Sequence, residues 1–139
     1  MLRDILTQLA NTLREEGEID ERESIIDATF ASANGGGDGT AITRRGKGVK
    51  ILALVDRDGL PLSVSTRAAN HHQVTLVQLS FDFYMLEAKP EQLIGDRAYD
   101  SDGLDDDLKQ DGVNMMAPHR STRQIRTKDG RSLRCYQRR

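Results

Sequence analysis

Two aspartates in this chain lie in or directly after apolar, strand-like runs, and their positions suggest chemistry. Asp27 lies inside "SIIDATF" (24–30), and Asp96 ends "LIGD" (93–96). A carboxylate in a buried strand needs a hydrogen-bond partner, a cation or a metal to offset its desolvation. If the two strands are neighbours, the carboxylates meet, and such hard oxygen ligands bind Mg²⁺ or Mn²⁺. Two such ions close together drive in-line displacement at phosphorus.

Each aspartate also has a simpler interpretation. Asp27 would need no partner on a strand face that is exposed to water, and Asp96 is suited to capping a turn or helix after Gly95. Taken singly, these interpretations are the more common ones. The presence of two such aspartates favours the metal-site hypothesis.

The stretch "LIGDRAYDSDGLDDDL" (93–108) contains six aspartates, for which a solvated helix start, a calcium loop and a divalent-metal site are the competing explanations. An EF-hand loop with its glycine at Gly103 would need an acid at Ala98 and a glutamate at Lys109, so the calcium loop is excluded. Most of the later aspartates precede or occupy the first turn of a short helix, where they cap free N–H groups and complement the helix dipole. These are Asp102, Asp105, Asp106 and Asp107.

Charge is unevenly distributed along the 139 residues, although the formal net charge is only −2. Residues 119–139 hold eight Lys or Arg and one Asp, whereas residues 1–118 hold 12 basic and 21 acidic side chains. A basic tail of this density indicates a polyanionic partner such as nucleic acid, and a solvated terminus explains it equally well. A second basic cluster, in "TRRGKG", contains Arg44, Arg45 and Lys47.

The elements that must position these residues follow from periodicity and turn signals. Apolar spacing predicts a helix over 2–16, ended by Gly17, and a helix from Asn70 whose apolar face reaches Tyr84 and Met85. Strands are expected at 24–30, 91–96 and 113–119, together with a hairpin over 47–68 that turns at "DRDG". A short helix is expected over 103–112. This order predicts an α/β fold with a mixed sheet and flanking helices.

The sequence also allows a prediction of where in the cell the protein is found. Its apolar runs are all much shorter than a membrane-spanning helix, and the first 20 residues lack the apolar core of a signal peptide. The single cysteine, Cys135, allows no internal disulfide. We therefore expect a cytoplasmic protein.

The chain resembles the DDE transposases of bacterial insertion sequences, in their short bacterial form, from about residue 20 to its end. The motifs occur in the order and spacing typical of that family. They are "IDATFASANGGGDGTAITRRGKGVKILALVDRDGLPLSVSTRAANHHQVTLV", "LIGDRAYDSDGLDDDL", "MMAPHR" and "KDGRSLRCYQRR".

The resemblance implies a ribonuclease H-like fold in which Asp27 and Asp96 match the first two catalytic acids. They would hold two Mg²⁺ ions, with Mn²⁺ as a substitute, for DNA cleavage and strand transfer at insertion-sequence ends. Basic residues of "TRRGKG" and of the tail would bind the phosphates of element ends and target DNA. These are Arg44, Arg45, Lys47, Arg120, Arg123, Arg126, Arg131 and Arg134.

One feature departs from the family pattern. The resemblance implies a third acid, a glutamate on a helix after the basic segment, and this sequence contains no glutamate after Glu91. We therefore expect the fold to lack its C-terminal helix, and only weak substitutes for the third acid are present, namely Asp100, Asp102 and Asp105. The expected division is a helical segment (1–22), a partial catalytic core (23–118) and a basic tail (119–139).

Two further functions remain open. One is an inactive transposase remnant that binds DNA, self-associates or pairs with a fuller transposase chain. The other is a ribonuclease H-like nuclease with a different substrate, because a shared fold does not fix function.

Overall fold

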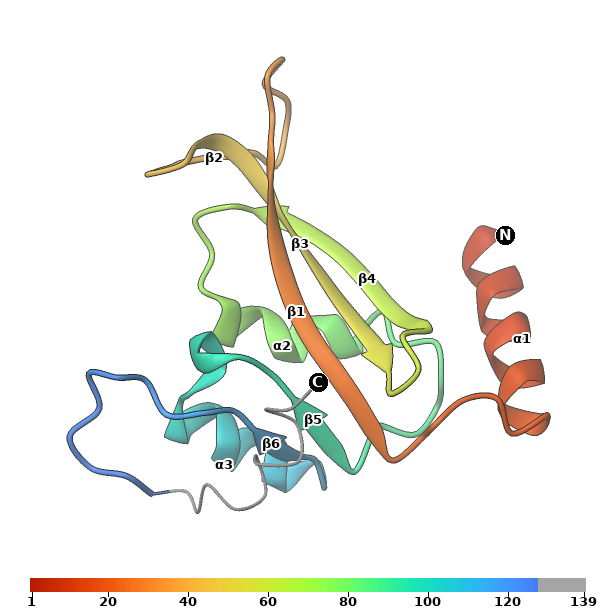
Figure 1. Cartoon of the computed structure of the whole chain (residues 1–139). Coiled ribbons are helices and arrows are strands. Elements are labelled where there is room, and N and C mark those ends of the chain that lie inside the picture. The colour runs from red at the N-terminus through yellow and green to blue at the C-terminus, as the bar shows by residue number, and fades with distance from the viewer. Residues whose placement is uncertain (128–139) are drawn as a thin grey trace.

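The computed structural model describes residues 1–127 and consists of a six-stranded sheet with helices packed against it, while the N-terminal helix stands to one side (Figure 1). The elements in chain order are α1 (Leu2–Glu15), β1 (Glu23–Ser32), β2 (Ala41–Thr43), β3 (Gly46–Asp56), β4 (Pro61–Ala68), α2 (Gln73–Phe81), β5 (Gln92–Ile94), the 3₁₀ helix η1 (Arg97–Tyr99), α3 (Asp102–Gln110) and β6 (Asn114–Met116). No helix within residues 1–127 has the length and apolar character needed to cross a membrane.

The sheet is mixed, as the sequence predicts. Its order is β2-β3-β1-β5-β6, and β4 also pairs with β3. The strands β1, β2 and β4 are antiparallel to β3, whereas β5 is parallel to both β1 and β6. The expected α/β architecture with flanking helices is therefore confirmed.

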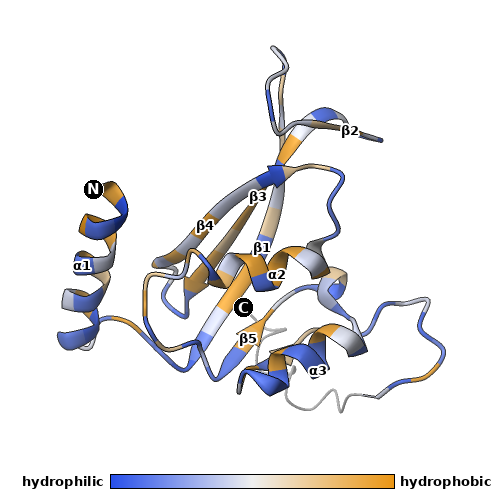
Figure 2. Cartoon of the chain, turned by 180° about the vertical axis from the view of Figure 1, so that it is seen from behind, coloured by the Kyte–Doolittle hydropathy of each residue, from blue (hydrophilic) through white to orange (hydrophobic). Residues whose placement is uncertain are grey.

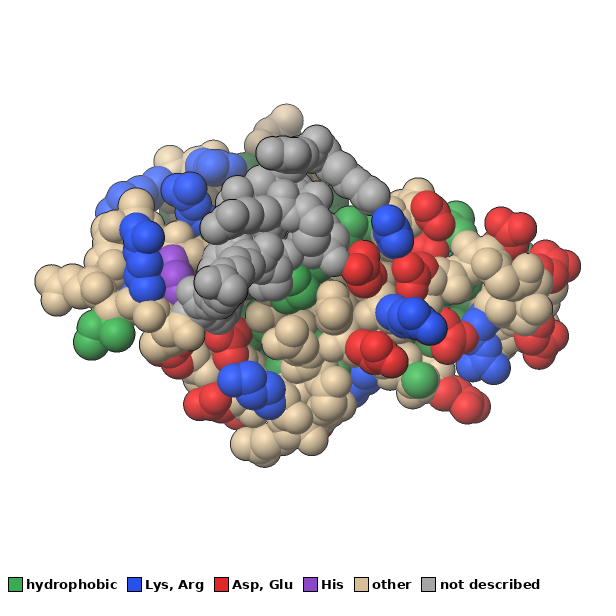
Figure 3. Space-filling view, turned by 60° about the horizontal axis from the view of Figure 1, so that its bottom comes forward, with side chains coloured by type: hydrophobic (Ala, Val, Ile, Leu, Met, Phe, Trp, Pro, Cys, Tyr) green, Lys and Arg blue, Asp and Glu red, His purple; other side chains and the backbone are tan. Residues whose placement is uncertain are grey.

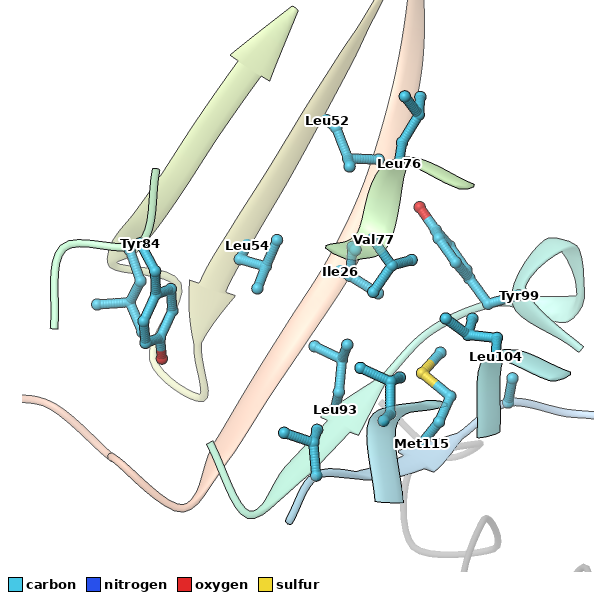
Figure 4. Close-up of a cluster of buried hydrophobic side chains, with 14 of the residues drawn as sticks. Ile26, Leu52, Leu54, Leu76, Val77, Tyr84, Leu93, Tyr99, Leu104 and Met115 are labelled. Atoms are coloured by element: carbon cyan, nitrogen blue, oxygen red, sulfur yellow. The ribbon is translucent and has the colours of Figure 1, made fainter. Parts of the chain in front are cut away.

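One face of the sheet forms the core. Along β1, Ser24 and Ile26 are buried while Ile25 and Asp27 are exposed, because successive side chains of a strand point to opposite faces. The register places Ile26 opposite Leu54 of β3. Helices α2 and α3 and the neighbouring strands complete the same cluster (Figure 4). It includes Leu52, Leu76, Val77, Leu93, Leu104, Leu108 and Met115. In Figure 2 the apolar colour follows β1 and β5 and parts of α2.

The β3–β4 hairpin turns at "DRDG", as expected. Asp56 is fully buried, and its Oδ1 accepts hydrogen bonds from the backbone N–H groups of Asp58 (3.0 Å) and Leu60 (2.7 Å). Gly59 has a φ of 93°, in the left-handed region that favours glycine. The carboxylate and the glycine together explain the tight turn.

The prediction for α2 was wrong in two details. Asn70 does not cap the helix, which begins at Gln73 after His72, because residues 68–71 form a turn in which His71 N–H donates to Ala68 C=O. The helix ends at Phe81, so Tyr84 and Met85 lie in the following segment. Tyr84 still reaches the core, where its hydroxyl lies 3.3 Å from Ser24 Oγ.

Candidate metal site

The parallel pairing of β1 with β5 brings Asp27 and Asp96 to matching positions. The last paired residues are Ile25 and Ile94, and the two aspartates follow two residues later on each chain segment. Paired residues of parallel strands project from the same face, and so do residues two apart. The two carboxylates are therefore placed to project from the same face, Asp27 from the middle of β1 and Asp96 just beyond the carboxyl end of β5. The region outside the carboxyl ends of strands is where ligands of open α/β sheets usually bind.

Both carboxylates are exposed and partly oriented by the backbone. Asp96 is the N-cap of η1, and its Oδ1 accepts a hydrogen bond from Ala98 N–H at 2.8 Å. Asp27 Oδ1 accepts from Ala28 N–H at 2.7 Å. The turn-capping interpretation of Asp96 is thus correct, and it is compatible with cation binding because a carboxylate has a second oxygen.

Tyr99 lies beneath this pair, and the sequence motifs did not predict its role. Its side chain is fully buried, and within residues 1–127 its hydroxyl has no hydrogen-bond partner (Figure 4). Burial and then the charges of Asp27 and Asp96 raise the pKa of Tyr99. The hydroxyl is therefore neutral at physiological pH and lies within the electrostatic field of both carboxylates. An aromatic residue among the aspartates of 96–107 was the only sequence signal.

Glycine at position 95 lets the Tyr99 ring approach the strand. A Cβ at Gly95 would lie 2.7 Å from Tyr99 Cδ2 and 2.8 Å from Met115 Cε. These distances are far below van der Waals contact, so any side chain here would displace the ring or the strand. Gly95 thus couples the β5 strand to the turn that follows Asp96.

The two carboxylates are suitable ligands for Mg²⁺ or Mn²⁺, but they are too few to complete the coordination shell of an ion. Magnesium commonly uses one or two carboxylates and completes its shell with water and substrate phosphates, which suits an exposed pair of aspartates. Within residues 1–127, no group of three or more His, Cys, Asp or Glu side chains is placed to hold a metal. The described donors therefore suit an ion that is shared with water and a phosphorylated substrate.

Asp100 serves a different purpose from the metal-ligand role considered for it. Its side chain is 1% exposed and accepts from His119 Nδ1 (3.1 Å), Arg120 N–H (2.8 Å) and Arg123 Nη1 (2.7 Å). Burial acts to raise the pKa of Asp100, but these hydrogen bonds and the charge of Arg123 outweigh it and lower the pKa. Arg123 also pairs with Asp102, whose pKa it lowers. Asp100 and Asp102 are thus tied to the basic segment.

The N-cap of α3 also differs from the prediction. Ser101, not an aspartate, caps the helix, and its Oγ accepts from Leu104 N–H at 3.4 Å. Asp102 and Asp105 lie in the first turn, as expected, where they complement the helix dipole.

The residues predicted to bind DNA fall into three groups. Arg44, Arg45 and Lys47 are exposed at the turn between β2 and β3, and Arg126 is exposed near residue 127. Arg120 and Arg123 make the contacts with the η1–α3 region. Arg131 and Arg134 lie outside the described residues. In Figure 3 Lys and Arg side chains gather on one side of the face shown, and acidic side chains dominate the opposite side.

Comparison with known proteins gives a family and a fold. Residues 18–139 match the family described as "Transposase DDE domain". A piggyBac transposase synaptic complex with hairpin DNA is similar in structure, with a TM-score of 0.54 and 14% identity over 77% of this chain and 26% of that chain. A simian T-cell lymphotropic virus intasome in complex with a PP2A regulatory subunit has a TM-score of 0.50 and 13% identity over 72% and 32% of the two chains.

These likenesses confirm the expected ribonuclease H-like fold. The chain spans about a quarter to a third of the length of the two solved chains. No curated protein sequence matches it significantly.

Proposed function

Since the chain belongs to the transposase DDE domain family, we propose that it is a catalytic-domain segment that cleaves DNA at insertion-sequence ends and joins these ends to target DNA. The observation that supports this most is the parallel β1–β5 register, which pairs Ile25 with Ile94 and, continued by two residues, matches Asp27 with Asp96. Phosphodiester chemistry needs concentrated negative charge that can hold cations next to a phosphate.

Asp27 and Asp96 would hold the divalent ions, with Mg²⁺ as the physiological metal and Mn²⁺ as its substitute. Members of this family generally use divalent metal ions. When bound, such ions activate the attacking oxygen and stabilise the leaving oxygen at phosphorus. The chain itself supplies exposed carboxylates on a rigid strand and on an adjoining turn, which fixes their separation before substrate arrives.

Basic side chains would hold the DNA backbone. Arg44, Arg45 and Lys47 extend from the β2–β3 turn and are exposed, so phosphates can reach them without breaking contacts within the chain. Phosphate contacts of this kind fix position and orientation without reading base sequence. We propose element ends and target DNA as partners, together with self-association or pairing with a fuller transposase chain.

Metal-dependent cleavage of duplex DNA tests the proposal. We expect nicking in Mg²⁺ or Mn²⁺ that is lost in Asp27→Asn and in Asp96→Asn, because each removes a charged ligand without changing side-chain size. Asp107→Asn is the matched control, since Asp107 is an exposed aspartate on α3 and is not one of the two proposed ligands. Cleavage that survives Asp27→Asn would refute the assignment. DNA binding without cleavage would instead favour the non-catalytic remnant.

A further inference from the structure

Arg120 contacts the turn that follows Asp96 from outside. Its Nη2 donates to Ala98 C=O at 2.8 Å, and its Nε donates to Arg97 C=O at 3.2 Å. One guanidinium thus bridges two successive carbonyls of η1, of which the Arg97 C=O also accepts from the Asp100 N–H at 3.3 Å. A planar guanidinium is suited to such a fork because its N–H groups are fixed relative to one another.

The backbone of Arg120 is itself anchored to the same region. Its N–H donates to Asp100 Oδ2 at 2.8 Å, and Asp100 follows η1 directly. His119 and Arg123 bind the other oxygen of Asp100, on either side of Arg120 in the chain. The Arg120 backbone is therefore already held beside η1, so only its side chain has to be ordered to make the two further hydrogen bonds.

The same turn orients Asp96. The Ala98 N–H donates to Asp96 Oδ1 at 2.8 Å, while the Ala98 C=O accepts from Arg120. Tyr99 N–H donates to Asp96 C=O at 3.1 Å, and its ring packs against Gly95. Movement of the 97–99 segment would therefore rotate the hydrogen-bond donor that orients the Asp96 carboxylate.

We propose that Arg120 is a positioning residue for Asp96, and not a DNA contact as its charge and place in the basic segment suggest. The Arg120 guanidinium donates to the carbonyl groups of Arg97 and Ala98 in the η1 turn. The Ala98 N–H of the same turn donates to the Asp96 carboxylate. The inference rests on the proposed function, because it assigns the orientation of a proposed metal ligand. These contacts also explain the basic residues within 119–123 without a role in DNA binding.

The test compares Arg120→Ala and Arg120→Lys with Arg126→Ala, a matched control that removes an exposed arginine from the same segment. Two quantities are measured in the full chain: Mn²⁺ affinity, from the electron paramagnetic resonance of free Mn²⁺, and the hydrogen-exchange rate of the Ala98 amide by nuclear magnetic resonance. We expect Arg120→Ala to weaken Mn²⁺ binding by about 10- to 100-fold, the usual effect of removing an outer partner of a metal ligand. Arg120→Lys should recover part of the affinity, because one ammonium can reach one carbonyl.

Exchange of the Ala98 amide should be about tenfold faster or more in Arg120→Ala, as expected when the turn loses the two hydrogen bonds that the Arg120 side chain donates to it. Exchange should be unchanged in Arg126→Ala. Equal Mn²⁺ affinity and equal exchange in Arg120→Ala and Arg126→Ala would overturn the inference. If the wild-type chain binds no Mn²⁺, the proposed function fails on its own. The exchange rate of Ala98 then decides whether Arg120 holds the turn.

Discussion

Gly95 is the residue at which the packing of the site is tightest. The position lies between β5 and Asp96, and a Cβ there would contact the Tyr99 ring and Met115 at less than 3 Å. Neither the ring nor the strand can move without disturbing Asp96, because Tyr99 N–H is bonded to Asp96 C=O. The smallest possible substitution at residue 95 should therefore alter both stability and the site.

We expect Gly95→Ala to lower the free energy of unfolding by about 1–3 kcal/mol, the usual effect of overpacking, and to weaken Mn²⁺ binding. Gly103→Ala is the control, because a Cβ at Gly103 would come no nearer than 4.0 Å to Ser101 Oγ. It lies in α3, where alanine is the better helix former, so stability should stay within about 1 kcal/mol of wild type or rise. Urea unfolding measures both, and equal stability of the two variants would contradict the packing argument.

At the scale of elements, the segment over 119–123 is joined to the η1–α3 region through the buried carboxylate of Asp100. The pKa of this carboxyl is lowered from its ordinary value of 3.8, because its hydrogen bonds and the charge of Arg123 outweigh the opposing effect of burial. The folded state therefore binds this proton less readily than the unfolded state does. The stability that Asp100 contributes is present above its unfolded pKa and is lost as the pH falls through 3.8 toward the lower folded pKa.

Asp100→Asn should remove the pH-dependent stability that the ionised Asp100 carboxylate contributes. The amide keeps one acceptor but turns an N–H donor toward other donors, so we expect a loss of about 1–3 kcal/mol at neutral pH. The difference from wild type should shrink as the pH falls below 3.8. Urea unfolding at several pH values measures it, with Asp107→Asn as the exposed control. A difference from wild type that is constant with pH would contradict the account.

At the scale of the whole molecule, charge is separated between the β2–β3 turn, with its exposed basic residues, and the acidic body. If Arg44, Arg45 and Lys47 bind phosphates, their combined replacement by alanine should weaken DNA binding. The slope of log affinity against log salt concentration should fall by about 0.9 for each phosphate that is no longer bound. Arg57→Ala is the control, because Arg57 is exposed in the β3–β4 turn, at the opposite end of β3. An unchanged slope in the triple variant would refute the role of this turn.

Local sequence patterns predicted most of the elements but fewer of the interactions between them. The apolar, β-prone run in 24–30, the "DRDG" turn and Gly112 were sufficient to place β1, the hairpin and the end of α3. The three-residue strand β2 and the 3₁₀ turn η1 were missed, because such short elements have no periodicity to detect. Asn70 was an incorrect N-cap because a turn over 68–71 delays the start of α2, and the His71 C=O of that turn accepts from Lys50 Nζ of β3, which local sequence does not reveal.

The candidate site was predictable only in part for a similar reason. Two strand-associated aspartates suggested convergence, but strand order and parallel direction depend on pairing between residues about 70 positions apart. The partners of Arg120 and Arg123 could not be predicted, since a basic segment carries no signal that distinguishes an internal carboxylate from a phosphate. Tyr99 was missed because nothing local marks a buried hydroxyl without a partner.

The most direct test of the account is a calorimetric Mn²⁺ titration of wild type, Asp27→Ala, Asp96→Ala and the double variant, each checked for folding by circular dichroism. The account predicts that each single substitution reduces affinity strongly and that the double variant is little worse than either, because both carboxylates serve one site. Affinity unaffected by either substitution, or losses that simply add in the double variant, would show that Asp27 and Asp96 do not share an ion.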